Sequence, residues 1–467
     1  MRTIDEHRRE VTALLSTIGA ATGDGAGAST DHRARAGAAA ESGAEDATGA
    51  AGSAGTADDR AAAEDLVVGA AELAVHPERY SYRILAEDVI APSSLPAFDN
   101  SQMDGYAVDS ADLASAGAGR PVELAVARRI AAGDSFGTHR RRTATPIMTG
   151  APVPAGADAV VQIEKADPPA FHPDDATGAT VTFTERVSPG LFVRVAGSDV
   201  REGEVLLPAG MVLGPAHYGV ISGSGATSVS VRPRVRVLLV STGHEIRDPG
   251  TALEPGQIFD ANSSALTAAL LAIGCAVVPA PCRSDDADDL LALLARHAAD
   301  VDLVVTVGGV SAGAREVVRD ALGPLGVEFM KVAMQPGGPQ GFGLASLPGA
   351  DGRASVDRPV VCLPGNPVSA LVSFEAFLRP ALLAAAGART TARELRRGTV
   401  TEAFDSPPTH HQLRRGLVRD DGTLELVGGP SSHLLHSYAG STVLVHVPVG
   451  VSSVSAGDEL DYWRIDG

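Results

Sequence analysis

The sequence predicts a multidomain α/β plus β protein whose largest part is a doubly wound parallel sheet. The chain has 467 residues, which is the length of about three ordinary domains. From Val235 onward, short and nearly continuous apolar runs alternate with helical segments, as in a parallel sheet covered by helices on both faces. Before and after that part, short alternating segments lie between turn residues, which indicates additional β domains.

The N-terminal part begins with a predicted amphipathic helix over residues 3–18. Thr3 and Glu6 form a capping-box pattern, and Ile4, Val11 and Leu15 fall on one helical face. Residues 20–63 consist mainly of Ala, Gly, Ser, Thr and Asp, a composition that predicts a disordered insert. We interpret it as a passive linker, with a partner-binding tail as the alternative.

Three further parts follow along the chain. Residues 91–203 show the alternation and turn residues of a β-rich domain. The doubly wound part contains the buried-strand runs "VRVLLVSTG", "CAVVPAP", "DLVVTVGG" and "RPVVCLPGNP", with helical segments such as "DDLLALLARHA" between them. After about Arg393 the short segments "LELVGG", "STVLVHVPV" and "ELDYWRI" predict a small C-terminal β domain.

Composition argues against several classes of partner. The net charge of −19 disfavours nucleic acid and anionic membranes as main partners, although a local site can still bind a small anion. Cys275, Cys282 and Cys362 form no CxxC pair, so we expect buried thiols and neither a disulfide framework nor a zinc site. We expect no apolar run of about 18 residues and no signal peptide, and therefore a cytoplasmic protein.

Polar residues follow each predicted parallel strand. They comprise Ser241 to Glu245, Ser284 to Asp286, the "GGVSAG" turn (308–313) with Glu316 after it, and the "PGNP" turn (364–367). Ligands of open α/β sheets bind at the carboxyl ends of the strands, where these residues converge. Glycine turns expose backbone N–H groups that bind oxyanions, and adjacent carboxylates suggest Mg²⁺.

Each strand end also has a purely structural interpretation. The "GGVSAG" turn suits a tight strand-to-helix connection, and Asp285 with Asp286 suits the start of a helix. "PGNP" suits a rigid turn with Pro367 as the first helical residue, and Glu245 suits a solvated turn position. The convergence of all four strand ends favours a site.

Longer motifs resemble one known family. "FDNSQMDGYAV" (98–108) is similar to the signature "FDNSAMDGYA" of the molybdopterin molybdenumtransferases, which insert molybdenum into the molybdenum cofactor, and of gephyrin-type domains. Other segments resemble the family in the same order and cover essentially the whole chain except the insert. They are "IMTGAPVPAGADAVVQIE" (147–164), "GSDVREGEVLLPAG" (197–210), "STGHEI" (241–246), "GQIFDAN" (256–262), "GGVSAG" and "CLPGNPVSALVSFEAFLRP" (362–380).

The resemblance implies a protein of four parts. They are an N-terminal helical region at 1–90 that carries the insert and pairs with 204–230, a β-rich domain at 91–203, a doubly wound molybdopterin-binding domain at 231–392, and a C-terminal β domain at 393–467. It also implies a homodimer whose active cleft lies between the doubly wound domain of one subunit and the β-rich domain of the other. Molybdopterin adenylyltransferase or acceptor molybdoenzymes are the implied protein partners.

Matching motif positions imply the following site residues. Asp104, Thr149 and Asp199 match positions on the dimer-partner side of the cleft, with Asp104 catalytic. Catalytic positions of the main site match Glu245, Asp285, Glu316 and Lys331, of which Glu245 and Asp285 are the expected metal ligands. The remaining matches are substrate-binding: Gly308, Gly309, Ser311, Pro364, Gly365, Asn366 and Pro367 in the main site, and Arg415, Ser432 and His433 at the C-terminal rim.

The implied reaction uses adenylylated molybdopterin and molybdate as substrates and Mg²⁺ as cofactor. Molybdate reaches the dithiolene, the phosphoanhydride is hydrolysed, and AMP leaves. Some residues depart from the family pattern: Gln335 and Gly338 stand where lysines are usual, and Ala314, His244 and Glu316 also differ.

These departures motivate an alternative, a non-catalytic molybdopterin-binding or scaffold protein of the same fold. A molybdopterin adenylyltransferase is disfavoured, because those enzymes resemble one domain only and lack the "FDNSxMDGYA" loop.

Overall fold

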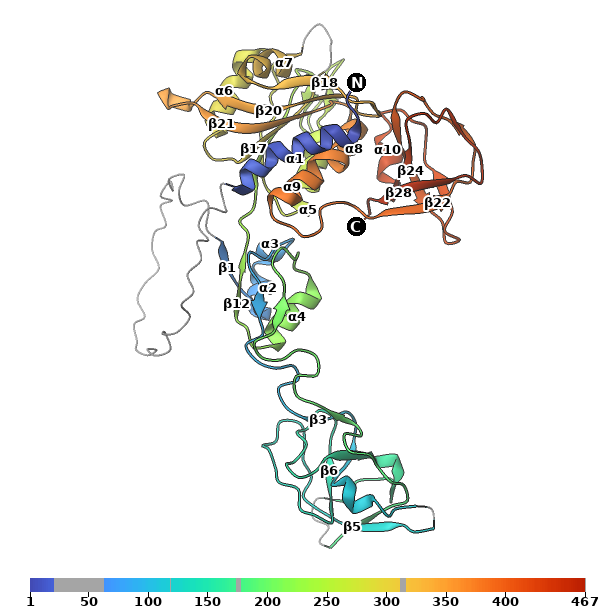
Figure 1. Cartoon of the computed structure of the whole chain (residues 1–467). Coiled ribbons are helices and arrows are strands. Elements are labelled where there is room, and N and C mark those ends of the chain that lie inside the picture. The colour runs from blue at the N-terminus through green and yellow to red at the C-terminus, as the bar shows by residue number, and fades with distance from the viewer. Residues whose placement is uncertain (21–62, 118, 174–177, 311–315, 467) are drawn as a thin grey trace.

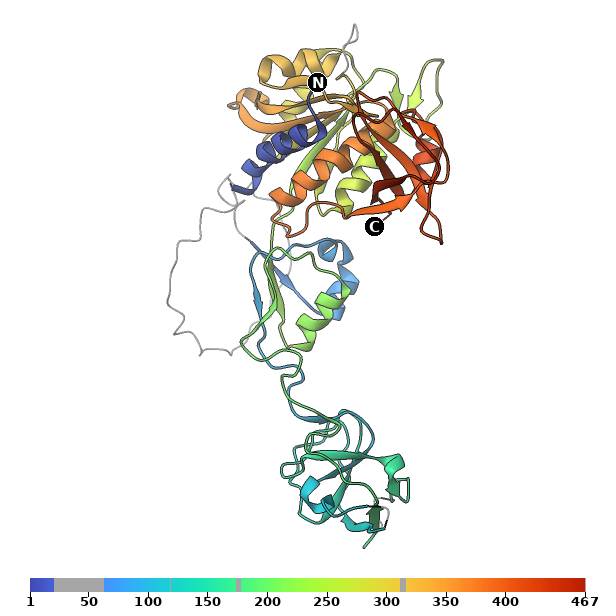
Figure 2. The ribbon, with the colours of Figure 1, turned by 45° about the vertical axis from the view of Figure 1, so that its right-hand side comes forward.

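The protein is described by a computed structural model that covers residues 1–20, 63–117, 119–173, 178–310 and 316–466. Apart from its end residues, the predicted insert at 20–63 lies outside these ranges, as do the predicted site residue Ser311 and Ala314. Figures 1 and 2 show an elongated molecule. The α/β domain and the C-terminal β domain lie side by side at one end, a small domain follows, and the β-rich domain forms the opposite end.

The α/β domain contains a six-stranded sheet of order β16-β13-β17-β21-β20-β18. β13, β16, β17 and β21 are parallel, whereas β20 runs antiparallel to both of its neighbours. The sheet is therefore mixed at one edge, because the connections on either side of β20 are too short for a crossover helix. The strands are β13 (Arg236–Ser241), β16 (Ala276–Pro279), β17 (Leu303–Val307), β18 (Glu328–Lys331), β20 (Pro339–Leu347) and β21 (Val356–Leu363).

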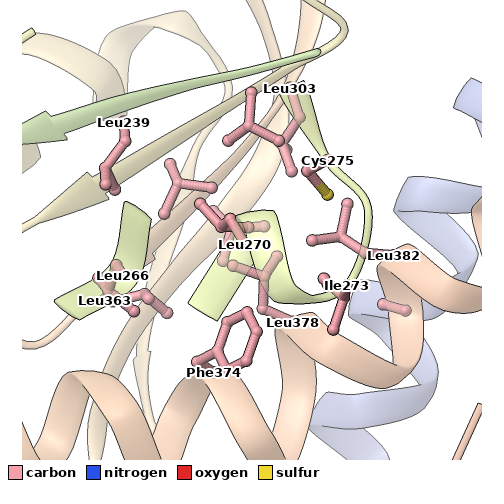
Figure 3. Packing of buried hydrophobic residues seen from close by; sticks show 14 of the residues in the cluster. Leu239, Leu266, Leu270, Ile273, Cys275, Leu303, Leu363, Phe374, Leu378 and Leu382 are labelled. Carbon is pink, nitrogen blue, oxygen red and sulfur yellow. The ribbon is translucent and has the colours of Figure 1, made fainter. Parts of the chain in front are cut away.

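Helices cover both faces of this sheet, as predicted. Alternate residues of β13 point to opposite faces: Val237 and Leu239 pack in one core, and Leu238 and Val240 in the other. The first core, part of which Figure 3 shows, is closed by helices α5, α8 and α9 and the second by α6 and α7. Their bounds are α5 (Ala261–Ala272), α6 (Ala287–His297), α7 (Val317–Leu322), α8 (Pro367–Ser373) and α9 (Arg379–Ala385).

The N-terminal helix α1 (Ile4–Ala20) packs on the α/β domain. Both hydrogen bonds of the predicted capping box are present, from Thr3 N–H to Glu6 Oε2 at 2.8 Å and from Glu6 N–H to Thr3 Oγ1 at 3.2 Å. Val11 and Leu15 are fully buried in the same core as α9. Residues 1–90, expected as one region, are thus divided between two parts of the molecule, because the apolar face of α1 is buried against α9.

One helical stretch differs from the expectation that no apolar run is long enough to cross a membrane. α8, a π turn (Phe374–Leu378) and α9 form one continuous helix, Pro367–Ala385. By length and composition alone, this helix is long and apolar enough to cross a membrane. Two thirds of its most apolar window, 67%, is buried inside the protein. Because Phe374, Leu378 and Leu382 pack in the sheet core, we interpret it as a core helix.

The small domain joins two distant chain segments. β1 pairs with β12 and β2 with β11, and the segments share one core that includes Leu66, Leu85, Leu213 and Ile221. This pairing places 204–230 beside residues 64–90, although the exact domain boundaries stay predictions. The elements are β1 (Glu64–Val67), α2 (Ala70–Val75), α3 (Pro77–Tyr80), β2 (Val89–Ile90), β11 (Val205–Leu207), α4 (Pro215–Gly223) and β12 (Ser228–Val231).

The β-rich domain contains a six-stranded sheet of order β7-β4-β6-β5-β9-β8, and β3 pairs separately with β10. Its core surrounds Tyr106, which is fully buried. Its strands are β3 (Asn100–Ser101), β4 (Gly105–Val108), β5 (Val122–Val126), β6 (Thr143–Ile147), β7 (Ala159–Gln162), β8 (Ala166–Asp167), β9 (Thr180–Phe183) and β10 (Val193–Arg194).

The C-terminal β domain takes one strand from the preceding α/β segment. β19 (Met334–Gln335) pairs in parallel with β24 and begins a sheet of order β19-β24-β26-β28-β22. The two domains are therefore joined through this sheet. The remaining elements are β22 (Leu395–Thr399), β23 (Phe404–Asp405), β24 (His411–Val418), β25 (Leu424–Leu426), α10 (Leu435–Ala439), β26 (Val443–Val447), β27 (Ser453–Val454) and β28 (Glu459–Arg464).

Candidate active site

A cavity of about 710 Å³ opens at the carboxyl ends of β13, β17 and β21. β13 and β17 are neighbours from which the chain continues in opposite directions across the sheet, so the cavity lies at the topological switch point. Its wall contains Ser241 and Thr242 after β13, Gly308 and Gly309 after β17, and the whole "PGNP" turn after β21. The predicted convergence of these three strand ends is therefore present in the structure.

Glycine is required where the strand ends meet. Gly308 has φ +100°, and a Cβ atom there would lie 2.9 Å from the carbonyl oxygen of Thr242. Gly309 has φ +63°, and its Cβ would lie 2.9 Å from Val318 Cγ2. Both positions combine a left-handed backbone with close packing, so a side chain would displace Thr242 of the cavity wall at one position and Val318 of α7 at the other.

Acidic side chains supply the charges of the described cavity wall. Glu245, Asp260 and Glu316 line it, and its described residues include neither lysine nor arginine. Asp285 lies beside this wall rather than in it. The ring of His244 lies between the carboxylates of Asp285 and Glu245 and is close to both. His244 Nδ1 is 2.9 Å from Asp285 Oδ2 and 3.8 Å from Glu245 Oε2.

Asp260 and Asn262 are cavity residues that the sequence analysis missed. Asp260 is buried, caps α5 by accepting from Ser263 N–H, and accepts from Ser241 Oγ at 2.5 Å. Asn262 donates from Nδ2 to the carbonyl oxygen of Gly365 at 2.7 Å and thus joins α5 to the "PGNP" turn. Both residues belong to the quoted "GQIFDAN" segment, so the signal was an acidic residue directly before an apolar helix.

The C-terminal domain contributes the loop 430–432 to the cavity wall. Arg415 is only 2% exposed and donates to the carbonyl oxygens of Gly429 and Ser431. These hydrogen bonds stabilise the conformation of the loop. Ser432 lines the cavity, whereas the His433 ring is within 2.7 Å of Ser431 Oγ and lies outside the lining. Of the three predicted rim residues, Ser432 alone lines the cavity.

The remaining predicted residues lie away from the cavity wall. Lys331 is exposed at the end of β18 and does not line the cavity. Asp104 accepts hydrogen bonds from Thr149 N–H at 2.7 Å and Thr149 Oγ1 at 2.9 Å, so these two residues form one unit. That unit belongs to the β-rich domain, which lies at the opposite end of the molecule from the α/β domain in Figure 1. Asp199 lies between the small and the β-rich domain, where its N–H donates to the carbonyl oxygen of Leu95 at 3.0 Å.

Comparison with known proteins agrees with this arrangement. Residues 55–225 match the model of the MoeA N-terminal region (domain I and II), and residues 238–384 match a probable molybdopterin binding domain. Molybdopterin molybdenumtransferase 2 of Mycobacterium tuberculosis is 43% identical over 391 residues, which cover 82% of this chain and 92% of that protein. The chain belongs to the molybdopterin molybdenumtransferase family.

Two further relatives extend the comparison. Molybdopterin molybdenumtransferase 1 of the same organism is 34% identical over 84% of this chain and 96% of its own length. A solved molybdopterin biosynthesis protein from Pyrococcus horikoshii superposes with a TM-score of 0.66 at 28% identity, covering 86% of this chain and 94% of that one. The predicted multidomain fold and family are confirmed by these matches.

Proposed function

We propose that adenylylated molybdopterin and molybdate react in the cavity at the carboxyl ends of β13, β17 and β21. The chain is a molybdopterin molybdenumtransferase of molybdenum cofactor biosynthesis, so it must hold a pterin and an oxyanion. The observation that carries the proposal is the meeting of three glycine-containing strand ends around one 710 Å³ space. That volume suits a small organic ligand, and the turns present backbone close to it.

Glu245 on the cavity wall and Asp285 beside it offer carboxylate oxygens of the kind that Mg²⁺ prefers. Adjacent carboxylates disfavour a phosphate or molybdate anion unless a cation lies between them, and no described wall residue is a cation. Mg²⁺ is commonly held by one or two carboxylates together with substrate phosphates and water. Mg²⁺ would be held by Glu245 and Asp285, whose carboxylates both lie near the His244 ring. The metal would neutralise the phosphate charge.

The protein's own groups bind and orient the substrates in this proposal. Backbone at Gly308, Gly309 and Gly365 holds the oxyanion against the sheet, and Glu316 is part of the same cavity wall. Breaking the phosphoanhydride adds a water oxygen to one phosphorus atom and releases AMP, so a carboxylate must orient that water and accept its proton. Glu245 and Glu316 are the carboxylates of the cavity wall that the family motifs also match.

A second chain would complete the site. Asp104 and Thr149 lie in the β-rich domain, which is distant from the α/β domain within one chain, and Asp199 lies beside Leu95 on the connection to that domain. We therefore assign all three to the cavity of a dimer partner. This assignment explains why an exposed unit such as Asp104 with Thr149 is fixed by two hydrogen bonds although the cavity of its own chain is remote. The cytoplasmic location and the protein partners stay predictions.

The proposal is tested by AMP release from adenylylated molybdopterin in the presence of molybdate and Mg²⁺. Glu245→Ala and Asp285→Ala should each lower turnover at least about a hundredfold, because the metal ligands are lost. Glu254→Ala is the matched control, since Glu254 is exposed in the same segment and lies outside the cavity lining.

Unchanged turnover in both test variants would overturn the assignment of this cavity. Binding of molybdopterin by the wild type without AMP release would favour the non-catalytic alternative.

A further inference from the structure

We infer that Gln335 donates its side-chain amide to the oxyanion in the cavity and that Gln412, from the C-terminal domain, fixes Gln335 in the orientation that allows this. Gln335 is thus a binding residue and Gln412 a positioning residue for the same substrate. The inference rests on the proposed function. Gln335 stands where a lysine is usual in the family, and the contact with Gln412 is what the motifs of the chain do not include.

The first observation is the charge of the cavity. Its described wall has three carboxylates and no basic side chain, so neutral donors are important for any anion that binds there. Gln335 lies on this wall, next to Pro336 and Gly337. A primary amide offers either two N–H donors or a carbonyl acceptor to a ligand, depending on how its plane is turned. Only the donor end attracts an oxyanion.

The second observation is the contact that determines this choice. Gln412 Nε2 donates to Gln335 Oε1 at 2.7 Å. The two residues are also backbone partners, because β19 pairs with β24 in the register Gln335 to Gln412. With its oxygen engaged, Gln335 directs its Nε2 away from Gln412, and within the described chain this nitrogen donates to no acceptor. The donor end of the amide is therefore available to a ligand.

The third observation is that Gln412 is held at an energetic cost. The residue is 1% exposed, and its own Oε1 is buried with no hydrogen-bond partner in the described part of the chain. An unpaired buried acceptor costs about 1–3 kcal/mol, whereas an apolar residue of similar size would avoid the cost. The group that Gln412 contributes to the surroundings is consequently its N–H donor, and the acceptor of that donor is Gln335.

The ligand is a tetrahedral oxyanion, either molybdate or a phosphate group of the nucleotide. Both present several acceptor oxygens and negative charge to the same donor, and a hydrogen bond to a charged group contributes about 1.5–3 kcal/mol. Separate binding measurements with molybdate alone and with AMP plus Mg²⁺ distinguish these two sources. Neither measurement requires turnover.

Gln412→Glu is the decisive variant. A carboxylate cannot donate to Gln335 Oε1 but accepts from Gln335 Nε2, so the amide turns and presents its oxygen to the cavity. We expect affinity for molybdate or for AMP to fall at least about tenfold, the effect of losing one hydrogen bond to a charged ligand. Gln412→Leu adds no buried charge and should cause a smaller loss, because Gln335 is then free to turn.

The double variants separate positioning from simple charge repulsion. If Gln412 acts through Gln335, Gln412→Glu should cause no further loss of affinity in a Gln335→Ala background. A side-chain ¹⁵N–¹H resonance assigned to Gln335 should also shift on addition of the bound anion in the wild type and not in Gln412→Glu. Gln257→Glu, an equal charge change at a residue outside the cavity lining, should bind as the wild type does.

Two results would overturn the inference. One is wild-type affinity for both anions in Gln412→Glu and Gln412→Leu; the other is an equal loss from Gln412→Glu with and without Gln335. A wild type that binds these anions but releases no AMP would refute the proposed function alone and leave the role of Gln335 and Gln412 standing.

Discussion

At the scale of single residues, His7 shows how burial affects the energetics of this protein. Its ring is fully buried between Phe342 and Phe377, at centroid distances of 5.3 and 4.6 Å, and neither ring nitrogen has a hydrogen-bond partner among the described residues. Burial disfavours the charged imidazolium and lowers the pKa of His7 from 6.5 to about 4. The ring is therefore neutral in the folded protein at pH 7.

This burial predicts a loss of stability in weak acid. Below pH 6.5 the unfolded chain protonates His7 while the folded chain does not, so stability falls as the pH drops from 6.5 towards 4. At pH 5 the protonation of His7 in the unfolded chain lowers the free energy of unfolding by about 2 kcal/mol relative to neutral pH. Urea unfolding at pH 7.5 and pH 5 should show a smaller pH-dependent loss in His7→Leu than in the wild type.

The control is His76→Leu, because His76 is exposed. We expect it to keep the pH dependence of the wild type. An identical pH dependence in His7→Leu and the wild type would contradict this account of His7.

Residues at strand ends were predictable, whereas residues brought in by tertiary packing were not. The "PGNP" turn directly follows an apolar run, and Glu245 and Glu316 lie in the turns after two others, so the rule for open sheets places them together. Gln335 and Gln412 are far apart in the sequence, and their contact depends on β19 joining the sheet of the next domain. Lys331 ends a strand at the antiparallel edge of the sheet, so its motif position did not bring it to the cavity wall.

At the scale of elements, α1 is part of the α/β domain, because its buried side chains help to form the core of that domain. It covers one flank of α9, and its buried face contacts the same core as β13 and β17. The sequence predicted the helix and its capping box but not its position. An amphipathic pattern reveals that a face is buried and does not reveal which surface covers it.

Leu15→Ala tests the contribution of α1 to the domain. Leu15 is fully buried, and truncation of such a leucine costs about 2–5 kcal/mol through lost burial and the cavity that remains. Ser16→Ala, at an exposed neighbouring position, should change stability by less than about 0.5 kcal/mol. Urea unfolding followed by circular dichroism measures both, and similar small effects would show that α1 is not part of the cooperative core.

At the scale of the whole molecule, the two groups of predicted site residues lie at opposite ends of one chain. The cavity is lined by residues of the α/β and C-terminal domains, whereas Asp104 and Thr149 lie in the β-rich domain. The order and general type of the domains were predictable from the sequence. The family resemblance also implied that Asp104 and Thr149 face the cleft of a dimer partner. Composition and hydrophobic periodicity could not predict this separation, because it depends on how the small domain holds its neighbours apart.

The central claim is that one reaction site needs the cavity of one chain and the Asp104 loop of a second chain. Mixing two inactive variants, Glu245→Ala and Asp104→Ala, tests it most directly through AMP release. Random pairing in a two-fold dimer gives one intact site in half of the dimers, so activity should recover to about a quarter of the wild-type value. If the mixture stays inactive after subunit exchange has been verified, or if Asp104→Ala alone is fully active, the claim is contradicted.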